Sequence, residues 1–493
     1  MSSKYILAID QGTSSTKTLL FDENGKVAAK GSVPLKSIFY GEGFVEQVPG
    51  EIYQNVLDSL ALCLADFKRG GGKPDDIQTC GISNQRETFV IWDDQGVPLH
   101  NAIVWQCKRS VDICSKLSAD GLAEMIKSKT GLIIDPYFSG TKLAWLYQHD
   151  QKVRKAIDSG KAYFGTIDTW LLYKLTDGQS YFTDYTNASR TLFFNLGTLN
   201  WDQELLNTFG LSALNLPTIK PSSFFFGTTD FNQLMPNGLS VTAMIGDSHA
   251  AAFGEGCFRT GTAKATLGTG CSILMNIGPE LQSSGSGMIS TICWSTEDQI
   301  AYALEGVIVS CGSTIEWLKN ELGLFSSSAE TESMARSVAD NNGVYFIPAF
   351  SGLGAPYWDM NRKAEISGLS FGANKNHIVR AALESVPYQI KDVVAAMEKD
   401  TGIALAGLMV NGGMTSNSFV LQFLADLLDK TVTNMGMPDV SALGTAYLAG
   451  LKTGFFTGIA QLETLNSDKT TLQPAVDKIM INQAYNGWKN AIT

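Results

Sequence analysis

Clustered positive charge and long apolar runs are both scarce in this sequence. Only 17% of its 493 residues are charged, and 48 Asp and Glu outnumber 37 Lys and Arg, which gives a formal charge of -11. Nucleic-acid backbones are held mainly by clustered Lys and Arg, so we expect no nucleic-acid partner. The first apolar stretch ends at Asp10, too early for a signal-peptide core or a membrane span. The expectation is a cytoplasmic protein without a membrane span.

Metal-binding and redox cysteine motifs are also missing. The eight cysteines are scattered and form neither a CxxC motif nor a Cys/His ligand cluster. Free cysteine is among the residue types most often found in protein interiors, so we interpret all eight as reduced core residues. They are Cys63, Cys80, Cys107, Cys114, Cys257, Cys271, Cys293 and Cys311.

A Walker-type phosphate loop is absent as well. That loop needs GxxxxGK followed by Ser or Thr, and the sequence contains no such run. Any nucleotide must therefore be held in another way. The sequence also lacks low-complexity tracts and long charge runs, which leaves an ordinary globular chain.

The length and the 44% of apolar residues indicate two large lobes, each with its own core. Short apolar runs at 5–9 and 18–21 flank the polar turn DQGTSSTK and predict a strand-turn-strand unit. A similar pattern returns at 262–275, where a Gly/Thr turn again separates apolar runs. The recurrence favours two similarly built lobes.

Helical periodicity appears between and after these units, which gives an α/β fold class. The segment 222–239 contains Gly and Pro and is predicted to be a surface loop near a lobe boundary, which we place near residue 250. The predicted helices span 51–67, 141–149, 168–175, 381–397 and 418–428.

The turn DQGTSSTK has the chemistry of a phosphate site. Its closely spaced N–H groups can cradle phosphate oxygens, while a carboxylate at the strand end can orient Mg²⁺ through water. A plain Ser/Thr-rich hairpin is the alternative. The candidate residues are Asp10 for the metal and Thr13, Ser14, Ser15 and Lys17 for the phosphates.

A second acidic turn, IGDSHAAAFGEG, places Asp247 directly after an apolar run and before a helix start rich in small residues. An aspartate at this place is either a general base or a helix N-cap. Two lobes that meet at a cleft would each contribute one acidic turn. In that arrangement Asp10 would serve the metal, and Asp247 would take a proton from an attacking hydroxyl.

Longer segments carry a family resemblance that runs essentially from end to end. The segments are GISNQRETFVIWD, NAIVWQCKRS, GLIIDPYFSGTKLAWL, GTIDTWLLYKLTDG, TDYTNASRTLFFN and IPAFSGLGAPYWD. Together they resemble the glycerol kinases, a branch of the FGGY carbohydrate kinases. Residues 137–149 match the first signature of the wider family, and 364–384 match the second.

The resemblance implies two actin-like domains with a ribonuclease H-like core and an active site in the cleft between them. Residues 1–250 would form the polyol-binding domain and 251–493 the nucleotide-binding domain. The implied reaction is ATP-dependent and Mg²⁺-dependent phosphorylation of a terminal hydroxyl of glycerol, which gives glycerol 3-phosphate and ADP.

The resemblance also implies roles for residues on the polyol side. Arg86, Glu87, Tyr137 and Asp247 would bind hydroxyl groups, and Trp105 would cover the C–H edge of the substrate. Without the family context, a surface Arg-Glu ion pair and a core Trp are the alternatives.

On the nucleotide side, the resemblance assigns Thr13, Ser14, Ser15 and Lys17 to the phosphates. Thr269 and Gly270 of LGTG would lie opposite them. The adenosine pocket would be lined by Gly312, Glu316, Gly413 and Asn417.

Four positions depart from the glycerol kinase pattern. Ser248 stands where Gln is usual, and Ser272 stands where Phe is usual, so the pocket is expected to be longer and wetter near the reacting end. A related acceptor such as erythritol, threitol, dihydroxyacetone or a xylulose-type ketose is therefore an alternative substrate. Lys17 replaces a common Arg, and Glu316 replaces a common Gln.

Regulation and rival functions complete the expectations. The segment 231–238, FNQLMPNG, lacks the Gly/Lys/Arg-rich run with which some bacterial glycerol kinases bind a sugar bisphosphate, so we predict no such control. An actin-like filament or chaperone ATPase, or a silent sugar sensor, would not need the polyol residues. The oligomeric state, homodimer or homotetramer, stays open.

Overall fold

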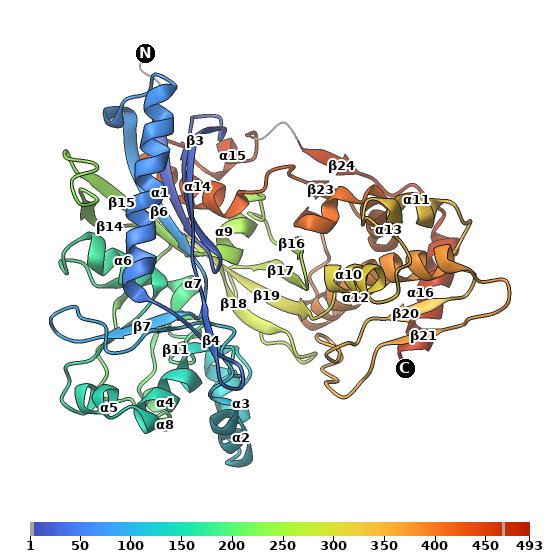
Figure 1. Ribbon diagram of the computed structural model, residues 1–493, viewed down its shortest axis with the longest axis horizontal. Helices are drawn as coiled ribbons and strands as arrows, with labels where there is room; N and C mark the ends of the chain where they lie inside the picture. Colours follow the sequence, from blue (N-terminus) through green and yellow to red (C-terminus); the bar gives the residue numbers. More distant parts are fainter. Residues whose placement is uncertain (1–3, 466–468) are drawn as a thin grey trace.

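The computed structural model describes residues 4–465 and 469–493 and contains two large mixed sheets, one in each half of the chain (Figure 1). Across the described residues the first sheet has six strands. In spatial order they are β14 (Ser223–Thr229), β15 (Leu239–Gly246), β6 (Ile77–Asn84), β1 (Tyr5–Gln11), β2 (Ser15–Phe21) and β3 (Val27–Pro34).

The second sheet has seven strands among the described residues. In spatial order they are β18 (Ile289–Ser295), β19 (Ile300–Ile308), β17 (Cys271–Gly278), β16 (Thr262–Leu267), β22 (Gly407–Asn411), β23 (Val432–Asn434) and β24 (Thr470–Leu472). In both sheets a hairpin is followed by parallel strands: β1 pairs antiparallel with β2 and parallel with β6, and β16 pairs antiparallel with β17 and parallel with β22. The prediction of two similarly built halves is confirmed.

Smaller sheets are inserted into this frame. A five-stranded sheet of the first half consists of β4 (Ile38–Tyr40), β5 (Phe44–Gln47), β8 (Ala102–Ile103), β7 (Phe89–Trp92) and β9 (Tyr163–Thr166). The two-stranded pairs are β10 (Phe182–Asp184) with β13 (Thr218–Lys220), β11 (Phe194–Asn195) with β12 (Asn200–Trp201), and β20 (Tyr345–Ile347) with β21 (Glu365–Ser367).

Helices cover both large sheets, and all five predicted helices are present. Those of the first half are α1 (Pro49–Arg69), α2 (Val111–Ala119), α3 (Ala123–Thr130), α4 (Ser139–His149), α5 (Gln151–Asp158), α6 (Ile167–Leu175), α7 (Tyr185–Ala188), α8 (Gln203–Thr208) and α9 (Asp247–Gly254). Those of the second half are α10 (Gly312–Asn320), α11 (Glu330–Arg336), α12 (Lys375–Thr401), α13 (Ser418–Leu428), α14 (Val440–Thr453), α15 (Ile459–Leu462) and α16 (Lys478–Ile492).

Side-chain alternation along β1 explains how the first sheet is covered on both faces. Leu7 and Ile9 point into a core shared with α1, whereas Ile6 and Ala8 point into a core shared with α9 and α14. Helix α14 comes from the second half of the chain, yet it packs across the strands of the first sheet, as its position beside the blue strands in Figure 1 shows. One helix from the second half of the chain therefore covers the first sheet and ties the two halves together.

The domain limits stay a prediction, since residue 250 falls within α9. The predicted loop at 222–239 is partly wrong. Ser223–Thr229 forms the edge strand β14, which pairs antiparallel with β15, and the register shifts before Gly227, a residue with a φ of 146°. The apolar residues of FFFGTT complete the sheet edge, and a turn remains only between β14 and β15.

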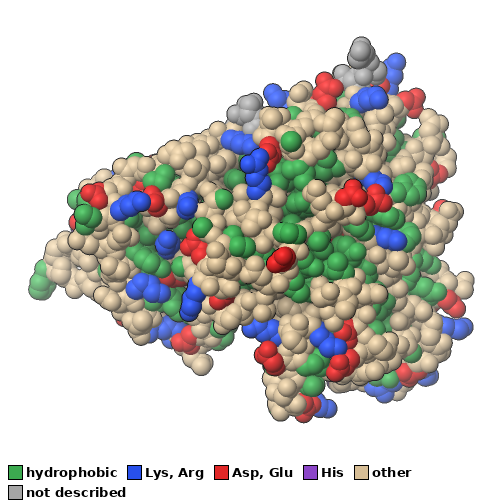
Figure 2. Space-filling view, turned by 180° about the vertical axis from the view of Figure 1, so that it is seen from behind, with side chains coloured by type: hydrophobic (Ala, Val, Ile, Leu, Met, Phe, Trp, Pro, Cys, Tyr) green, Lys and Arg blue, Asp and Glu red, His purple; other side chains and the backbone are tan. Residues whose placement is uncertain are grey.

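Surface and core composition follow the sequence expectations. Each of the eight cysteines lies within the described part of the chain, buried and without a disulfide partner. Figure 2 shows Lys and Arg side chains interspersed with Asp and Glu on the face that it presents. Within 4–465 and 469–493, none of the helices combines the length and apolar character needed to cross a bilayer.

The crossing of α9 and α14 generates a stability prediction. A methyl group at Gly444 would lie 1.9 Å from the carbonyl oxygen of Ala250, and its backbone neighbours leave no room to relax. We expect Gly444→Ala to destabilise the protein by about 1–3 kcal/mol, because overpacking forces the two helices apart. The measurement is the denaturant midpoint.

The matched control is Gly50→Ala in α1, where a methyl group would meet nothing within 4 Å. This control should be neutral or slightly stabilising, because alanine favours the helix. Equal midpoints for both variants would contradict the tight crossing.

Candidate functional site

The carboxyl ends of three parallel strands of the first sheet bring the two acidic turns together, so the expectation that each lobe contributes one of these turns is wrong. Asp10 of β1 is in register with Ser83 of β6, and Ile245 of β15 is in register with the same serine. Asp247 follows two residues later, as the first residue of α9. The carboxyl edge of such a sheet is where ligands bind in open α/β folds.

Asp10 and Asp247 lie close enough to influence each other. Burial raises the pKa of Asp247, the guanidinium of Arg86 opposes this, and the carboxyl of Asp10 raises it further. Burial likewise raises the pKa of Asp10, against a 2.7 Å hydrogen bond that Ser83 donates to its Oδ1. The N-cap interpretation of Asp247 is wrong: Gly246 is the N-cap of α9, and no side chain makes the cap hydrogen bond.

A chamber of about 420 Å³ opens beside Asp247, and we call it the charged chamber. Its lining comes from both halves of the chain and includes all seven residues predicted to bind the substrate. The lining residues are Thr13, Arg86, Glu87, Trp105, Tyr137, Asp247, Ser248, Ala251, Lys264, Thr266, Ser272, Asn411, Pro438, Val440 and Ser441.

Arg86 and Glu87 do not form the surface ion pair of the alternative interpretation. Arg86 is buried, donates to Glu305 at 3.0 Å and lies 3.5 Å from Asp247. Glu87 pairs with Arg190 at 2.6 Å, and Arg190 lies 2.8 Å from Glu305. The four charges thus alternate along a buried chain, so each is neutralised by a neighbour.

The local backbone helps to aim these side chains. Glu87 has a φ of 60°, in the left-handed region that non-glycine residues rarely adopt, so the chain turns sharply after β6. Ser139 donates a hydrogen bond to the Glu87 carbonyl and ties this turn to α4.

Glu305 was not found from the sequence, although it links the two halves. It lies in β19, where Ala301 and Ala303 face the core shared with the first sheet. Alternation therefore points Glu305 toward the first half as well. Burial opposes its ionisation, but the guanidinium groups of Arg190 and Arg86 outweigh burial and hold the pKa of Glu305 well below its usual value. A lone glutamate in the apolar run AYALEGVIV was the signal available.

Aromatic side chains form one wall of the chamber. The rings of Trp105 and Tyr137 meet edge to face at 5.6 Å, and Trp105 Nε1 donates to Thr13 Oγ1 at 2.9 Å. Lys142, a further residue that sequence reasoning missed, donates to three successive carbonyls at 136–138 and braces the turn that carries Tyr137. Trp105 is thus a wall of the cavity rather than a core residue.

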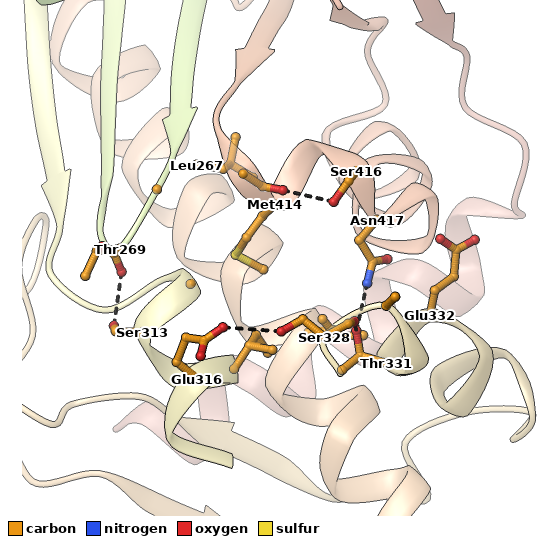
Figure 3. Close-up of a pocket in the computed structure, with 16 residues that line it drawn as sticks. Leu267, Thr269, Ser313, Glu316, Ser328, Thr331, Glu332, Met414, Ser416 and Asn417 are labelled. Atoms are coloured by element: carbon orange, nitrogen blue, oxygen red, sulfur yellow. Dashed lines mark hydrogen bonds between the residues drawn. The ribbon is translucent and has the colours of Figure 1, made fainter. Parts of the chain in front are cut away.

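A second cavity, of about 720 Å³, lies within the second half, and we call it the second-sheet cavity (Figure 3). It holds five of the six residues predicted for this side of the nucleotide: Thr269, Gly312, Glu316, Gly413 and Asn417. The sixth, Gly270, lies in the same turn, and its carbonyl accepts a 2.9 Å hydrogen bond from Gly268.

Figure 3 shows how this cavity is built. Glu316 of α10 accepts a hydrogen bond from Ser328 on one side, and Asn417 bonds Thr331 on another. Gly312 begins α10 where a methyl group would lie 2.7 Å from the Gly268 carbonyl, so glycine lets the helix start against the turn.

For the turn DQGTSSTK, the structure puts only some of the predicted phosphate-binding residues beside a cavity. Thr13 lines the charged chamber, whereas Ser14 is exposed and Ser15 is half-buried at the start of β2. Lys17 is engaged elsewhere: it donates to Asp439 at 3.0 Å, and the same carboxylate binds Lys30 at 2.5 Å. The structure brings Lys17 to the second half of the chain, and its phosphate role stays a prediction.

Comparisons with known proteins agree with this geometry. Family models for the N-terminal and C-terminal domains of the FGGY family of carbohydrate kinases match residues 5–254 and 263–453. The chain belongs to the FGGY family of carbohydrate kinases. It is therefore a kinase, and its resemblance to this family is confirmed.

Individual FGGY members show the extent of the similarity. The glycerol kinase of Carboxydothermus hydrogenoformans is 44% identical over 494 residues, covering 100% of this chain and 98% of that protein. A Shewanella glycerol kinase is 44% identical over 495 residues, covering 100% and 99%. The crystal structure of Plasmodium falciparum glycerol kinase with ADP has a TM-score of 0.93 at 34% identity, covering 100% of this chain and 98% of that one. A ligand-bound xylulose kinase from Lactobacillus acidophilus, 22% identical with a TM-score of 0.87, shares the fold. The predicted α/β fold of two actin-like domains is confirmed.

The buried charge chain of this FGGY kinase yields a stability prediction. Glu305→Gln would leave the guanidinium groups of Arg86 and Arg190 without their shared carboxylate. We expect a loss of about 3–5 kcal/mol, because breaking a buried pair leaves an uncompensated buried charge. Calorimetric or denaturant unfolding measures the loss.

The control is Glu365→Gln, an exposed residue at the protein surface whose partner Arg362 lies 3.2 Å away. Such surface pairs contribute about 0–1 kcal/mol. A Glu305→Gln protein as stable as this control would refute the central role of Glu305.

Proposed function

We propose that this FGGY kinase transfers the γ-phosphoryl group of ATP to a terminal hydroxyl of glycerol, giving glycerol 3-phosphate and ADP. One observation carries the proposal: the two cavities meet on the same two strands. On β16, Thr266 lines the charged chamber and the next residue, Leu267, lines the second-sheet cavity. Asn411, the last residue of β22, also lines the charged chamber, and Gly413, two residues later, lines the second-sheet cavity. A nucleotide in one cavity would reach an acceptor in the other.

The second-sheet cavity fits a nucleotide in size and in lining. Its volume is within the roughly 300–1,000 Å³ usual for small-molecule sites. Leu267, Ile315 and Met414 supply apolar walls for a base, while Glu316 and Asn417 supply hydrogen-bonding groups at its edge. The turn at 268–270 lines this cavity through Gly268 and Thr269, and the backbone N–H groups of residues 269 and 270 are the proposed phosphate donors.

The residues present also fit a magnesium ion bound mainly through phosphate and water. No group of three or more His, Cys, Asp or Glu that could hold a metal occurs in 4–465 and 469–493. Mg²⁺ usually binds through one or two carboxylates together with substrate phosphates. Asp10 would be that carboxylate, and the ion would neutralise charge on the phosphate oxygens when bound.

The charged chamber suits a small hydroxylated acceptor. Arg86 Nε, a donor, and Asp247 Oδ1, an acceptor, lie 3.5 Å apart. A hydroxyl group beside both atoms could accept from Arg86 and donate to Asp247. Glu87 offers a further acceptor, and Tyr137 and Trp105 cover a hydrocarbon edge. In the proposed reaction Asp247 accepts the hydroxyl proton while Arg86 holds the alcohol in place.

The remaining parts of the proposal follow from the reaction. A cytoplasmic location would supply the ATP that the transfer consumes. A related polyol or short ketose stays the alternative acceptor, because Ser248 and Ser272 both line the chamber. A filament ATPase or sugar sensor would show no acceptor-dependent turnover. An ADP-release screen across glycerol, dihydroxyacetone, erythritol, threitol, xylitol and short ketoses distinguishes these alternative functions.

Asp247→Asn tests the proposed base. We expect kcat to fall by about 10²–10⁴, because an amide cannot accept the proton, with ATP affinity nearly unchanged. Asp177→Asn is the control: this exposed residue has a φ of 49°, which asparagine tolerates, and its turnover should stay normal. Normal turnover in Asp247→Asn would end the assignment.

The pH profile provides an independent check on the same residue. Asp247 must be ionised to act, and burial raises its pKa, with Arg86, Asp10 and Lys264 as the charges that face it. As pH falls, activity should therefore be lost with a midpoint above about 3.9, which is the pKa of an ordinary aspartate. An acid limb at or below that value would contradict the raised pKa of Asp247.

Ser272→Phe tests acceptor size. Ser272 points into the chamber and donates to Glu305 at 3.2 Å, so a phenyl ring there would fill space beside the reacting end. We expect kcat/KM for four-carbon polyols to fall about 10–200-fold relative to glycerol. Ser272→Ala, which removes the hydroxyl without filling space, should keep the wild-type ratio. An unchanged ratio in Ser272→Phe would exclude Ser272 as a determinant of acceptor length.

A further inference from the structure

A buried lysine lies in the wall of the charged chamber, on the strand that also reaches the second-sheet cavity. Lys264 is 1% exposed, lies in β16 and lines the charged chamber. Its Nζ donates to Ser248 Oγ at 2.7 Å and to Thr266 Oγ1 at 3.0 Å. Ala263 and Ala265 on either side face the core of the second half, so alternation turns Lys264 and Thr266 toward the chamber.

The two hydroxyl groups that accept from Lys264 belong to different parts of the site. Ser248 follows Asp247, the proposed base, in α9, and Thr266 precedes the turn at 268–270, the proposed phosphate contact. Lys264 bridges them. The ammonium group thus contacts the residue next to the proposed base and a residue that shortly precedes the proposed phosphate turn.

A purely structural role accounts poorly for this lysine. Burial lowers its pKa and Arg86 adds repulsion, while Glu255, Glu305 and Asp247 favour the charged form. Yet no carboxylate of the described residues lies within 4.0 Å of its Nζ. The direct contacts of the ammonium are two hydroxyl groups of the chamber wall, which leaves one N–H to donate.

Glu255 is the carboxyl group that would explain Lys264 structurally. It is 1% exposed and accepts a 2.5 Å hydrogen bond from Asn411, while its Oε2 has no hydrogen-bond partner among the described residues. The attraction of Lys264 acts on it from a distance, and burial raises the pKa of Glu255 to about 7. Glu255 therefore balances charge without holding the ammonium in place.

We propose that Lys264 is a catalytic residue that binds an oxygen of the phosphoryl group during its transfer, with Ser248 and Thr266 as positioning residues. The inference rests on the proposed kinase reaction. In that step the bond from phosphorus to the ADP oxygen breaks and a bond to the acceptor oxygen forms. The acceptor proton passes to Asp247, and Lys264 keeps its own proton throughout.

Lys264→Met tests the proposal by turnover and by binding. We expect kcat to fall by about 10²–10³, as when one preorganised donor to a transition-state oxygen is removed. Calorimetry should show the affinity for β,γ-imido ATP weakened about tenfold or more, with ADP affinity within about twofold of wild type, because only the former carries a γ-phosphate. Wild-type kcat, or equal losses for both nucleotides, would overturn the proposal.

Glu255→Gln is the matched control and should keep turnover within about fivefold, because Glu255 acts on Lys264 only through space. The double variant Lys264→Met with Glu255→Gln removes both buried charges. If Lys264 served only to balance Glu255, the double variant would regain activity. We expect it to stay as inactive as Lys264→Met.

A wild-type experiment decides the case even if these variants fail to fold. An acyl phosphate of ATP, with its acyl group on the γ-phosphate, transfers that group to a neighbouring amine and releases ATP. We expect mass spectrometry to find Lys264 acylated and ATP to prevent it. Acylation at Lys17 without Lys264 would overturn the assignment.

The two proposals fail in distinguishable ways. The acceptor screen is run first on the wild-type protein, and the variants are then assayed with whichever acceptor supports turnover. Wild-type protein without acceptor-dependent turnover would sink the proposed function. Normal turnover in Lys264→Met would sink only the role of Lys264.

Discussion

The carboxylate of Glu305, shared between two buried guanidinium groups, is the interaction on which the site depends. Glu305 belongs to β19, the strand next to the edge of the second sheet, whereas Arg86 and Arg190 belong to the first half. Without Glu305, Arg86 would keep only Asp247 and Arg190 only Glu87 as a partner, and an incompletely paired charge in the interior is strongly destabilising. The charged chamber therefore exists only when both halves of the chain are in place.

The rest of the site follows from strand alternation around this contact. One face of β16 packs on the core of the second half, and the other presents Lys264 and Thr266 to the first half. Arg86 aims at the chamber because β6 ends beside it, and Asp247 does so because α9 begins there. Hinge motion between the halves would change the distances between the chamber walls together, since each wall belongs to a strand or a helix.

Much of the fold follows from local pattern, and the remainder depends on contacts that local pattern does not contain. Apolar runs around Gly/Thr turns predict both hairpins, and periodicity predicts α13 at its observed bounds. The segment at 222–239 misleads because Gly227 interrupts the edge strand that its aromatic residues form. Crossing of α14 onto the first sheet has no local signal, since its partners lie about two hundred or more residues away in sequence.

The site shows the same division. Arg86 and Glu87 were found through a family motif and Asp247 through its acidic turn. Their partners were not found, because Glu305 lies 219 residues from Arg86. Glu305 and Lys264 are each the only charged residue of their strand, and both are buried. Their roles become clear only from the charged chamber that the folded chain forms around them. A single charged residue in a buried strand is therefore a pointer to this chamber that the motifs do not supply.

The central claim is that phosphoryl transfer takes place where the two cavities meet. Phosphorus NMR of a reaction with ATP and glycerol tests it most directly, by following the fate of the γ-phosphorus. The account predicts one phosphate monoester on a terminal carbon of glycerol for each ADP formed. ADP accompanied by inorganic phosphate alone would contradict it.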